Sequence, residues 1–205
     1  MRRYDVNVET PIDEVIDLAS RYVAVRRALA EALSDSSRLT REYASQVLLD
    51  IAQTDPEMVG EFSTAFIDAL HRPEAPTRYN VLAIIGILAQ KDMRLVDTAW
   101  DGIEECLYDE DSGTVRLAAF KVIAAYGATT PTRSKKVWPL ISDALRCYHG
   151  DAEFISMLNE FIAMLKGNVA DEVKQEACDQ FKFNAENATG LFQRKAKEIV
   201  SFICK

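Results

Sequence analysis

The sequence has few residues that interrupt helices, and few that cross-link a chain through disulfides or metal ions. Its 205 residues include only 8 Gly, 6 Pro, 4 Cys and 2 His. So few helix breakers leave room for long helices, and cysteines without paired or metal-type spacing predict neither a disulfide framework nor a metal centre. Isolated cysteines are usually small buried hydrophobic residues. We therefore expect a reduced, cytoplasmic protein with four core thiols, at Cys106, Cys147, Cys178 and Cys204.

Long apolar runs and an excess of positive charge are also missing. No run of about 18 apolar residues occurs, so no membrane span is predicted. The N-terminus, Met1 to Asp5, leads into acidic residues rather than an apolar block, and no signal peptide is predicted. The chain has 24 Lys and Arg against 32 Asp and Glu, a net charge of −8. Because nucleic-acid binding depends on neutralised phosphates, this balance disfavours a nucleic-acid partner.

A period of 38 residues dominates the sequence, in which 48% of residues are hydrophobic. Apolar or small residues recur at this interval in columns that lie three, four and seven positions apart, on one face of a helix. The two strongest columns read Ala44, Leu82, Phe120, Leu158 and Ala196, and Val47, Ile85, Ile123, Phe161 and Ile199. Five copies of one unit at this period predict a helical solenoid.

Each copy is predicted to be a first helix (A), a tight polar turn and a second helix (B), with the A helices of the second and third repeats at about 55–70 and 93–108. We place the repeats at about 10–53, 54–91, 92–130, 131–168 and 169–205, in a single domain spanning 1–205. Thr10 and Pro11 form a typical helix start, but the pattern leaves open whether the first 35 residues form one helix or two. The A helices have core columns of their own, which read Phe62, Trp100 and Trp138, and Ala69, Leu107, Leu145 and Phe183.

Helix pairs of this length, with an Arg at the start of the second helix, resemble HEAT repeats of the ARM-like family. The residues that carry the resemblance are Thr40-Arg41, Thr77-Arg78, Val115-Arg116 and the Pro within Trp138-Pro139-Leu140-Ile141. The resemblance implies an all-α, right-handed α-α superhelix (solenoid) of about five helix pairs with a short N-terminal leading helix. It does not extend to the Arg column of the last two repeats, which have Ile155 and Gln193 or Arg194 there.

No residue pattern points to catalysis, and we predict no catalytic, metal-binding or cofactor-binding residue. His71 and His149 both close A helices, where the helix dipole favours them. The acidic run from Asp97 to Asp111 is best explained as a solvated face, and the basic clusters at 133–136 and 194–197 as solubilising charges with local ion pairs. The absence of Ser-His-Asp, Cys-His, Gly-rich phosphate-loop and His-x-x-x-His patterns agrees with this interpretation.

The resemblance implies that B helices line the concave side of the solenoid, the surface that such proteins use for binding. Beside the core columns runs a stripe of short or polar residues that changes from acidic to basic along the chain. We therefore predict a scaffold or interaction module whose partner is a protein or peptide, and a homodimer remains open. The predicted partner-binding residues, which should face solvent, are Glu42, Ser45, Asn80, Lys121, Ser156, Asn159, Arg194 and Lys197.

The alternative is a nucleic-acid-processing enzyme or nucleic-acid binder of the HEAT-like DNA glycosylase type. Such an enzyme needs a cationic channel with aromatic side chains and a carboxylate for the flipped base. Here Trp100 and Trp138 fall in A helices, and the net charge has the opposite sign. Retention on heparin at low salt would discriminate the two functions.

Overall fold

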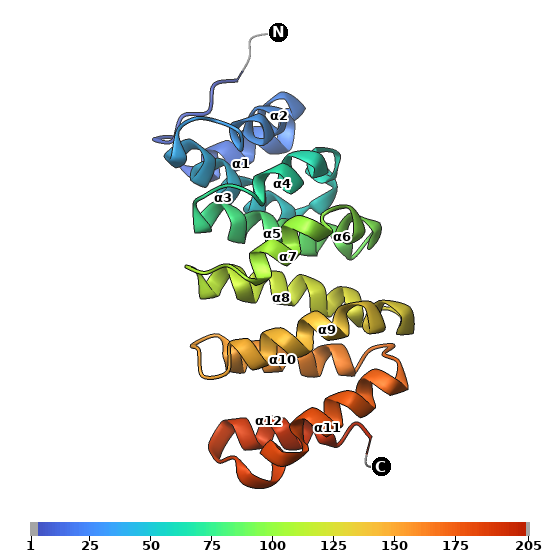
Figure 1. Cartoon of the computed structure of the whole chain (residues 1–205). Coiled ribbons are helices and arrows are strands. Elements are labelled where there is room, and N and C mark those ends of the chain that lie inside the picture. Colours follow the sequence, from blue (N-terminus) through green and yellow to red (C-terminus); the bar gives the residue numbers. More distant parts are fainter. Residues whose placement is uncertain (1–3, 204–205) are drawn as a thin grey trace. The chain divides into compact units, whose positions relative to one another are not determined.

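A computed structural model describes residues 4–203, and every regular element in that range is helical (Figure 1). The all-α prediction is therefore confirmed, and no helix in this range is both long and apolar enough to cross a membrane. The α-helices are α1 (Ile12–Arg21), α2 (Val23–Ala32), α3 (Arg38–Thr54), α4 (Ser63–Ala69), α5 (Ala75–Ala89), α6 (Arg94–Thr98), α7 (Trp100–Leu107), α8 (Gly113–Gly127), α9 (Pro131–Cys147), α10 (Phe154–Leu165), α11 (Asp171–Asn187) and α12 (Gly190–Val200).

The chain divides into two compact units, residues 1–119 (unit 1) and 120–205 (unit 2), and the boundary falls inside α8. The helices α3, α5, α8, α10 and α12 are the predicted B helices. That 1–205 forms one repeat domain stays a prediction.

The N-terminal segment of unit 1 contains two helices rather than one. The α1 and α2 helices are separated at Tyr22, whose backbone is extended (φ −127°, ψ 111°). Thr10 does not cap α1 with its side chain as predicted. Instead, its carbonyl oxygen accepts a hydrogen bond of 2.7 Å from the Tyr43 hydroxyl of α3.

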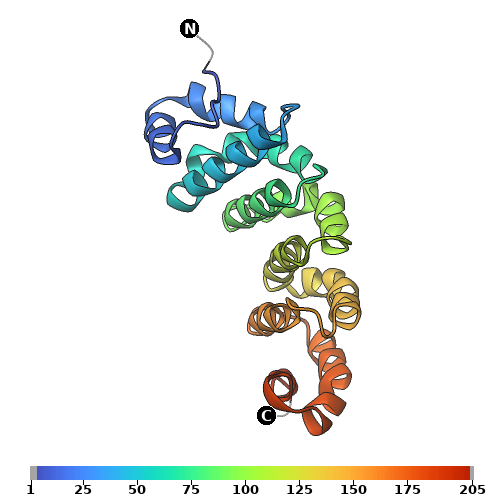
Figure 2. The same ribbon diagram turned by 90° about the vertical axis from the view of Figure 1, so that its left-hand side faces the viewer.

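Two of the B helices, α3 and α5, lie side by side (Figures 1 and 2).

The A helices of the second and third repeats are irregular. In place of a continuous helix from Asp55 to Leu70, two 3-10 segments, η1 (Pro56–Met58) and η2 (Gly60–Phe62), precede the short α4. Gly60 is a poor helix former, which accounts for part of this break. In the next repeat α6 and α7 are interrupted at Ala99 (φ −89°, ψ 5°), and nothing in the local sequence explains that interruption.

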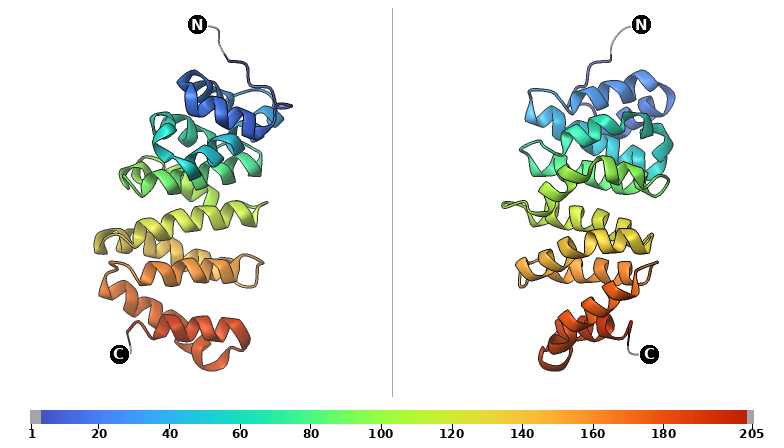
Figure 3. Two further views of the ribbon diagram at one scale, coloured as in Figure 1. Left: turned by 180° about the vertical axis from the view of Figure 1, so that it is seen from behind. Right: turned by 45° about the vertical axis from the view of Figure 1, so that its right-hand side comes forward.

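Unit 2 has longer and more regular helices. The predicted A helices α9 and α11 each have 17 residues, and α9 runs through Pro139 without ending. The turn before α10 contains Gly150 (φ 98°), and Gly190 (φ 66°) is the first residue of α12; both backbone conformations favour glycine. In both views of Figure 3 the last two helices, α11 and α12, pack against each other.

The core follows the 38-residue columns closely. All five residues of the column from Ala44 to Ala196 are 0% exposed, and those of the column from Val47 to Ile199 are at most 1% exposed. The A-helix columns are less completely buried, because Trp100 is only half-buried and Phe183 is 70% exposed. The prediction that Phe183 is a core residue was therefore wrong.

Candidate partner-binding surfaces

Buried charges at the repeat turns position the B helices of unit 1. Arg41, at the start of α3, donates to both carboxylate oxygens of Glu74, at 2.6 and 2.7 Å. It also donates to the carbonyls of Asp35 and Ser36, at 2.7 and 3.1 Å. Glu74 immediately precedes α5, so this ion pair ties the start of one B helix to the start of the next.

The same arrangement recurs one repeat later. Arg78 of α5 forms an ion pair with Asp109, in the turn before α8. Asp109 also accepts hydrogen bonds from the backbone N–H groups of Asp111 (3.0 Å) and Ser112 (2.7 Å). Arg116 of α8 donates to the Asp109 carbonyl at 2.9 Å. The Arg residues that carried the resemblance are therefore structural, and Asp109 is a buried turn residue rather than part of a solvated face.

Two of the predicted partner-binding residues are buried instead of exposed. Ser45 is 0% exposed and Asn80 is 4% exposed. The Asn80 side-chain amide donates to the Ser45 hydroxyl at 3.0 Å, and that hydroxyl donates to the Glu42 carbonyl at 2.8 Å. The expectation that they face solvent failed because α3 and α5 pack together, so each helix buries a flank as well as its core face.

Asn80 nevertheless lines a cavity of about 310 Å³ on the B helices of unit 1. Beside it lies Tyr79, which is 43% exposed. The remaining lining residues are Gln46 of α3, Ala75 and Pro76 of α5, and Thr114 of α8. We call this space the Tyr79 cavity. Tyr79 was not among the predicted partner-binding residues, although a large aromatic side chain beside a polar stripe was a usable signal.

The other predicted residues remain accessible to different degrees. Glu42 of α3 is half-buried and is held at 2.7 Å by Arg38 of the same helix. In unit 2 Ser156 of α10 is half-buried. Four residues of unit 2 are exposed on its B helices, namely Lys121, Asn159, Arg194 and Lys197.

Each histidine contacts a side chain from another helix. The His71 Nδ1 atom lies 2.8 Å from the Glu105 carboxylate, and both side chains are exposed. The His149 ring packs edge-on against Phe154 and Phe192, with centroids 4.8 and 5.1 Å apart. Both residues follow their helix ends as predicted, but their contacts are with side chains.

The tryptophans and the first basic cluster have structural contacts. Trp138 is 7% exposed and donates to Glu176 at 2.6 Å, whereas the half-buried Trp100 donates to Glu104 at 2.9 Å. Trp138 is therefore unavailable for stacking on a flipped base, as the glycosylase alternative requires. The cations of the basic cluster on α9 also contact neighbouring side chains, one an aromatic ring and one a carboxylate. Arg133 and Lys136 lie over the Tyr126 ring, and Lys135 pairs with Glu172 at 3.0 Å.

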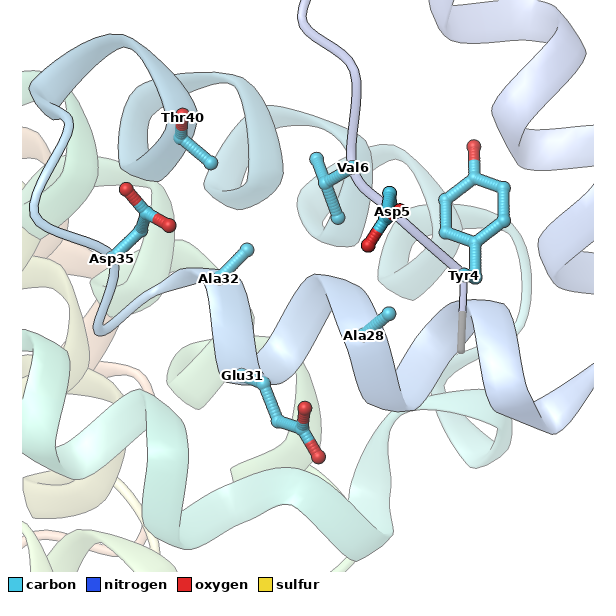
Figure 4. Close-up of a pocket in the computed structure, with 8 residues that line it drawn as sticks. All are labelled: Tyr4, Asp5, Val6, Ala28, Glu31, Ala32, Asp35 and Thr40. Carbon is cyan, nitrogen blue, oxygen red and sulfur yellow. The ribbon is translucent and has the colours of Figure 1, made fainter. Parts of the chain in front are cut away.

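Two further cavities lie in unit 1. One of about 360 Å³ is lined by residues 4–6, α2 and the start of α3 (Figure 4). It contains Asp5, Glu31 and Asp35, but Figure 4 shows the Glu31 carboxylate pointing away from the other two. No group of His, Cys, Asp or Glu within residues 4–203 is placed to hold a metal ion. The other cavity, of about 560 Å³, lies between η1, the end of α5 and α6.

The cysteines differ in accessibility. Cys106 and Cys178 are buried as predicted, Cys147 is exposed, and Cys204 lies outside the described residues. Burial raises the pKa of the Cys106 thiol to about 12. In a Cys204→Ser background we therefore expect Cys147 to react with a maleimide before Cys106 and Cys178, because its thiol is exposed, although desolvation and the nearby Asp143 carboxylate raise its pKa and slow the reaction. Mass spectrometry of the labelled peptides would check this, and early labelling of Cys106 would contradict it.

No protein-family model and no curated protein matches the sequence. Solved structures of repeat proteins do match. A designed armadillo repeat protein in complex with the peptide (KR)4 superposes with a TM-score of 0.70 at 15% identity, over 96% of each chain. A computationally designed armadillo repeat protein for modular peptide recognition has a TM-score of 0.67 at 20% identity, covering 93% of this chain and 91% of that one.

A natural protein has the same type of fold. The archaeal HEAT-like repeats protein from Thermococcus onnurineus NA1 matches with a TM-score of 0.56 at 14% identity, covering 96% of this chain and 94% of that one. At these identities the likeness establishes the fold alone. The fold is that of the armadillo and HEAT repeat solenoids, as the 38-residue period and the Arg column predicted.

Proposed function

We propose that this chain is a non-enzymatic interaction module that binds a protein or peptide segment on the exposed side of its B helices. The observation that carries the proposal is the Tyr79 cavity. Its volume of about 310 Å³ lies at the lower end of the range for ligand sites. Likeness to designed armadillo proteins, one in complex with a peptide and one made for peptide recognition, supports a peptide segment as the occupant.

The chemistry of the cavity suits a peptide. The exposed Tyr79 ring offers a large apolar surface with a polar end, the kind of side chain that dominates binding energy at interfaces. Gln46 and Asn80 use their amide N–H groups on Asp50 and Ser45. The amide oxygens are hydrogen-bond acceptors, and each can accept a backbone N–H of a bound segment. Pro76 and Ala75 are short enough to let that backbone approach.

The experiment is a selection of peptides from a random displayed library on the immobilised protein, followed by calorimetry with one selected peptide. Tyr79→Ala should weaken binding by tenfold or more, the effect of losing about 1.4 kcal/mol at a hot spot. The matched control is Tyr22→Ala, because Tyr22 is 57% exposed but lies between α1 and α2, outside the B helices.

Both variants should keep their helical circular dichroism, since both side chains are largely at the surface. Weaker binding with Tyr22→Ala and unchanged binding with Tyr79→Ala would place the site away from the B helices. A selection that yields no peptide dependent on Tyr79 would contradict the proposal.

A further inference from the structure

Charge is divided very unevenly between the two units. Residues 1–119 contain 22 Asp and Glu against 12 Lys and Arg, a net charge of −10. Residues 120–205 contain 10 Asp and Glu against 12 Lys and Arg, a net charge of +2. Unit 2 is therefore the basic part of an acidic chain, and its surface favours partners of the opposite sign from those of unit 1.

The excess positive charge of unit 2 is concentrated on and beside its B helices. The cations there are Lys121 of α8, Lys166 after α10, and Arg194, Lys195 and Lys197 of α12. Two carboxylates lie on these helices themselves, Glu160 of α10 and Glu198 of α12, and Asp151 and Glu153 precede α10 at the end opposite to Lys166. We call the surface formed by these five cations together with Glu160 and Glu198 the basic B face.

The two carboxylates hold these cations only loosely. The Lys121–Glu160, Lys166–Glu198 and Lys195–Glu198 pairs have N–O distances of 3.9, 3.4 and 3.8 Å. Charge-assisted hydrogen bonds are normally about 2.7–2.9 Å long. The Lys121 and Lys166 side chains remain 53% and 61% exposed. Arg194 and Lys197 are exposed and form no ion pair with a described residue. Most of the positive charge therefore stays available to a partner.

The exposed residues of the basic B face follow the repeat. Lys121, Asn159 and Lys197 are 38 residues apart, on α8, α10 and α12. Neighbouring packed helices are about 10 Å apart, so the two lysines are separated by roughly 20 Å across α10. An extended chain rises about 3.3 Å per residue and crosses that span in about six residues. The exposed Ala163 and the half-buried Ser156 of α10 are short, so a backbone can approach between the charges.

We propose that the basic B face of unit 2 binds an extended acidic peptide segment whose carboxylates pair with Lys121 and with Lys197 and Arg194. This inference rests on the proposed function and names the chemistry of one of its partners. The Glu160 carboxylate lies 3.9 Å from the Lys121 Nζ atom, and the exposed Asn159 precedes Glu160 on α10. Both side chains can accept backbone N–H groups of the segment. A nucleic acid fits less well, because its phosphates donate no hydrogen bond to Glu160 and Glu198, whereas the backbone N–H groups of a peptide can.

The test measures fluorescence anisotropy of a labelled octapeptide of alternating Asp and Glu with the full chain. The variant is Lys121→Gln combined with Lys197→Gln. Its control is Arg146→Gln combined with Lys182→Gln, two exposed cations on α9 and α11. Both double variants remove two positive charges, so a difference between them reports position rather than net charge. Each side chain is exposed, so folding should be nearly unchanged in both.

We expect the first variant to weaken binding of the acidic octapeptide by about tenfold and the control by less than about twofold. Raising NaCl from about 50 to about 300 mM should weaken the wild-type complex, because exposed charges are screened. Equal loss in both variants, or tighter binding of a short oligothymidine than of the acidic octapeptide, would overturn the inference. If the acidic octapeptide does not bind while Tyr79-dependent peptide binding persists, this inference is wrong and the proposed function stands.

Discussion

Replacing Glu74 with glutamine is expected to lower the free energy of unfolding by about 3–5 kcal/mol, the range for removing one partner of a buried ion pair. The Glu74 side chain is 1% exposed and that of Arg41 is 10% exposed. Glutamine keeps the shape but loses the negative charge, so the Arg41 guanidinium stays buried without a counter-charge. Urea denaturation monitored by circular dichroism at neutral pH would measure the change.

A matched control separates this pair from an ordinary surface ion pair. Glu42→Gln removes the partner of Arg38, an exposed residue of the same helix. Exposed pairs of this kind contribute about 0–1 kcal/mol, so Glu42→Gln should change stability little. A Glu74→Gln variant that is as stable as the Glu42→Gln variant would show that the turn pair does not hold α3 to α5.

The same pair predicts how stability depends on pH. Burial by itself raises the pKa of Glu74, but the hydrogen bonds and charge of Arg41 oppose it and hold that pKa below its ordinary value. A carboxylate whose pKa is depressed in the folded state stabilises the protein at pH values above its unfolded-state pKa of about 4.3. This stabilisation is lost as the pH falls through the folded-state pKa. The stability gap between the wild type and Glu74→Gln should therefore narrow in acid. A gap that stays constant down to about pH 3 would contradict the ionised state of Glu74.

Trp138→Ala should destabilise the protein by about 3–5 kcal/mol, as expected for emptying a large aromatic site in a core. The Trp138 ring stacks on Phe161 with centroids 5.6 Å apart, and its N–H group reaches Glu176 of α11 at 2.6 Å. The side chain thus connects α9 to α10 and to α11. Chemical denaturation would measure the loss, and a loss under about 1 kcal/mol would remove Trp138 from the core.

Trp138→Phe separates packing from the hydrogen bond. Phenylalanine keeps most of the ring contact with Phe161 but cannot donate to Glu176, so we expect a loss of about 1–2 kcal/mol. The remaining fluorescence then comes from Trp100, which is half-buried. Its emission should lie at longer wavelength than that of the wild type. An unchanged spectrum would show that the two indoles have similar exposure.

The core of this protein was predictable, whereas its functional surface was only partly so. The columns from Ala44 and Val47 are buried throughout because a residue on the inner face of a helix pair has one environment, repeated at each period. Ser45 and Asn80 show the limit of the same reasoning. Their position beside the core predicted exposure, but the contact between α3 and α5 buries them. Helical periodicity identifies one buried face of a helix, but it does not predict that a neighbouring helix also buries one of the flanks.

The A helices of unit 1 show a second limit. Apolar spacing predicted continuous helices over 55–70 and 93–108, but the chain forms η1, η2 and α4 in one and α6 and α7 in the other. Apolar spacing is compatible with several nearby backbone geometries, and tertiary packing selects among them. The cavity of about 560 Å³ that these segments border was therefore not predictable from composition.

By itself, the sequence determined the helical class, the 38-residue repeat, the core columns and the acidic N-terminal and basic C-terminal parts of the chain, because these depend on residue type and spacing. Only the tertiary structure decided that Arg41 and Arg78 are held by Glu74 and Asp109, that Tyr79 borders a cavity and that Phe183 is exposed. Those outcomes depend on which helices touch and on which side. One-dimensional periodicity does not specify that, because each helix has several flanks and packing covers only some of them.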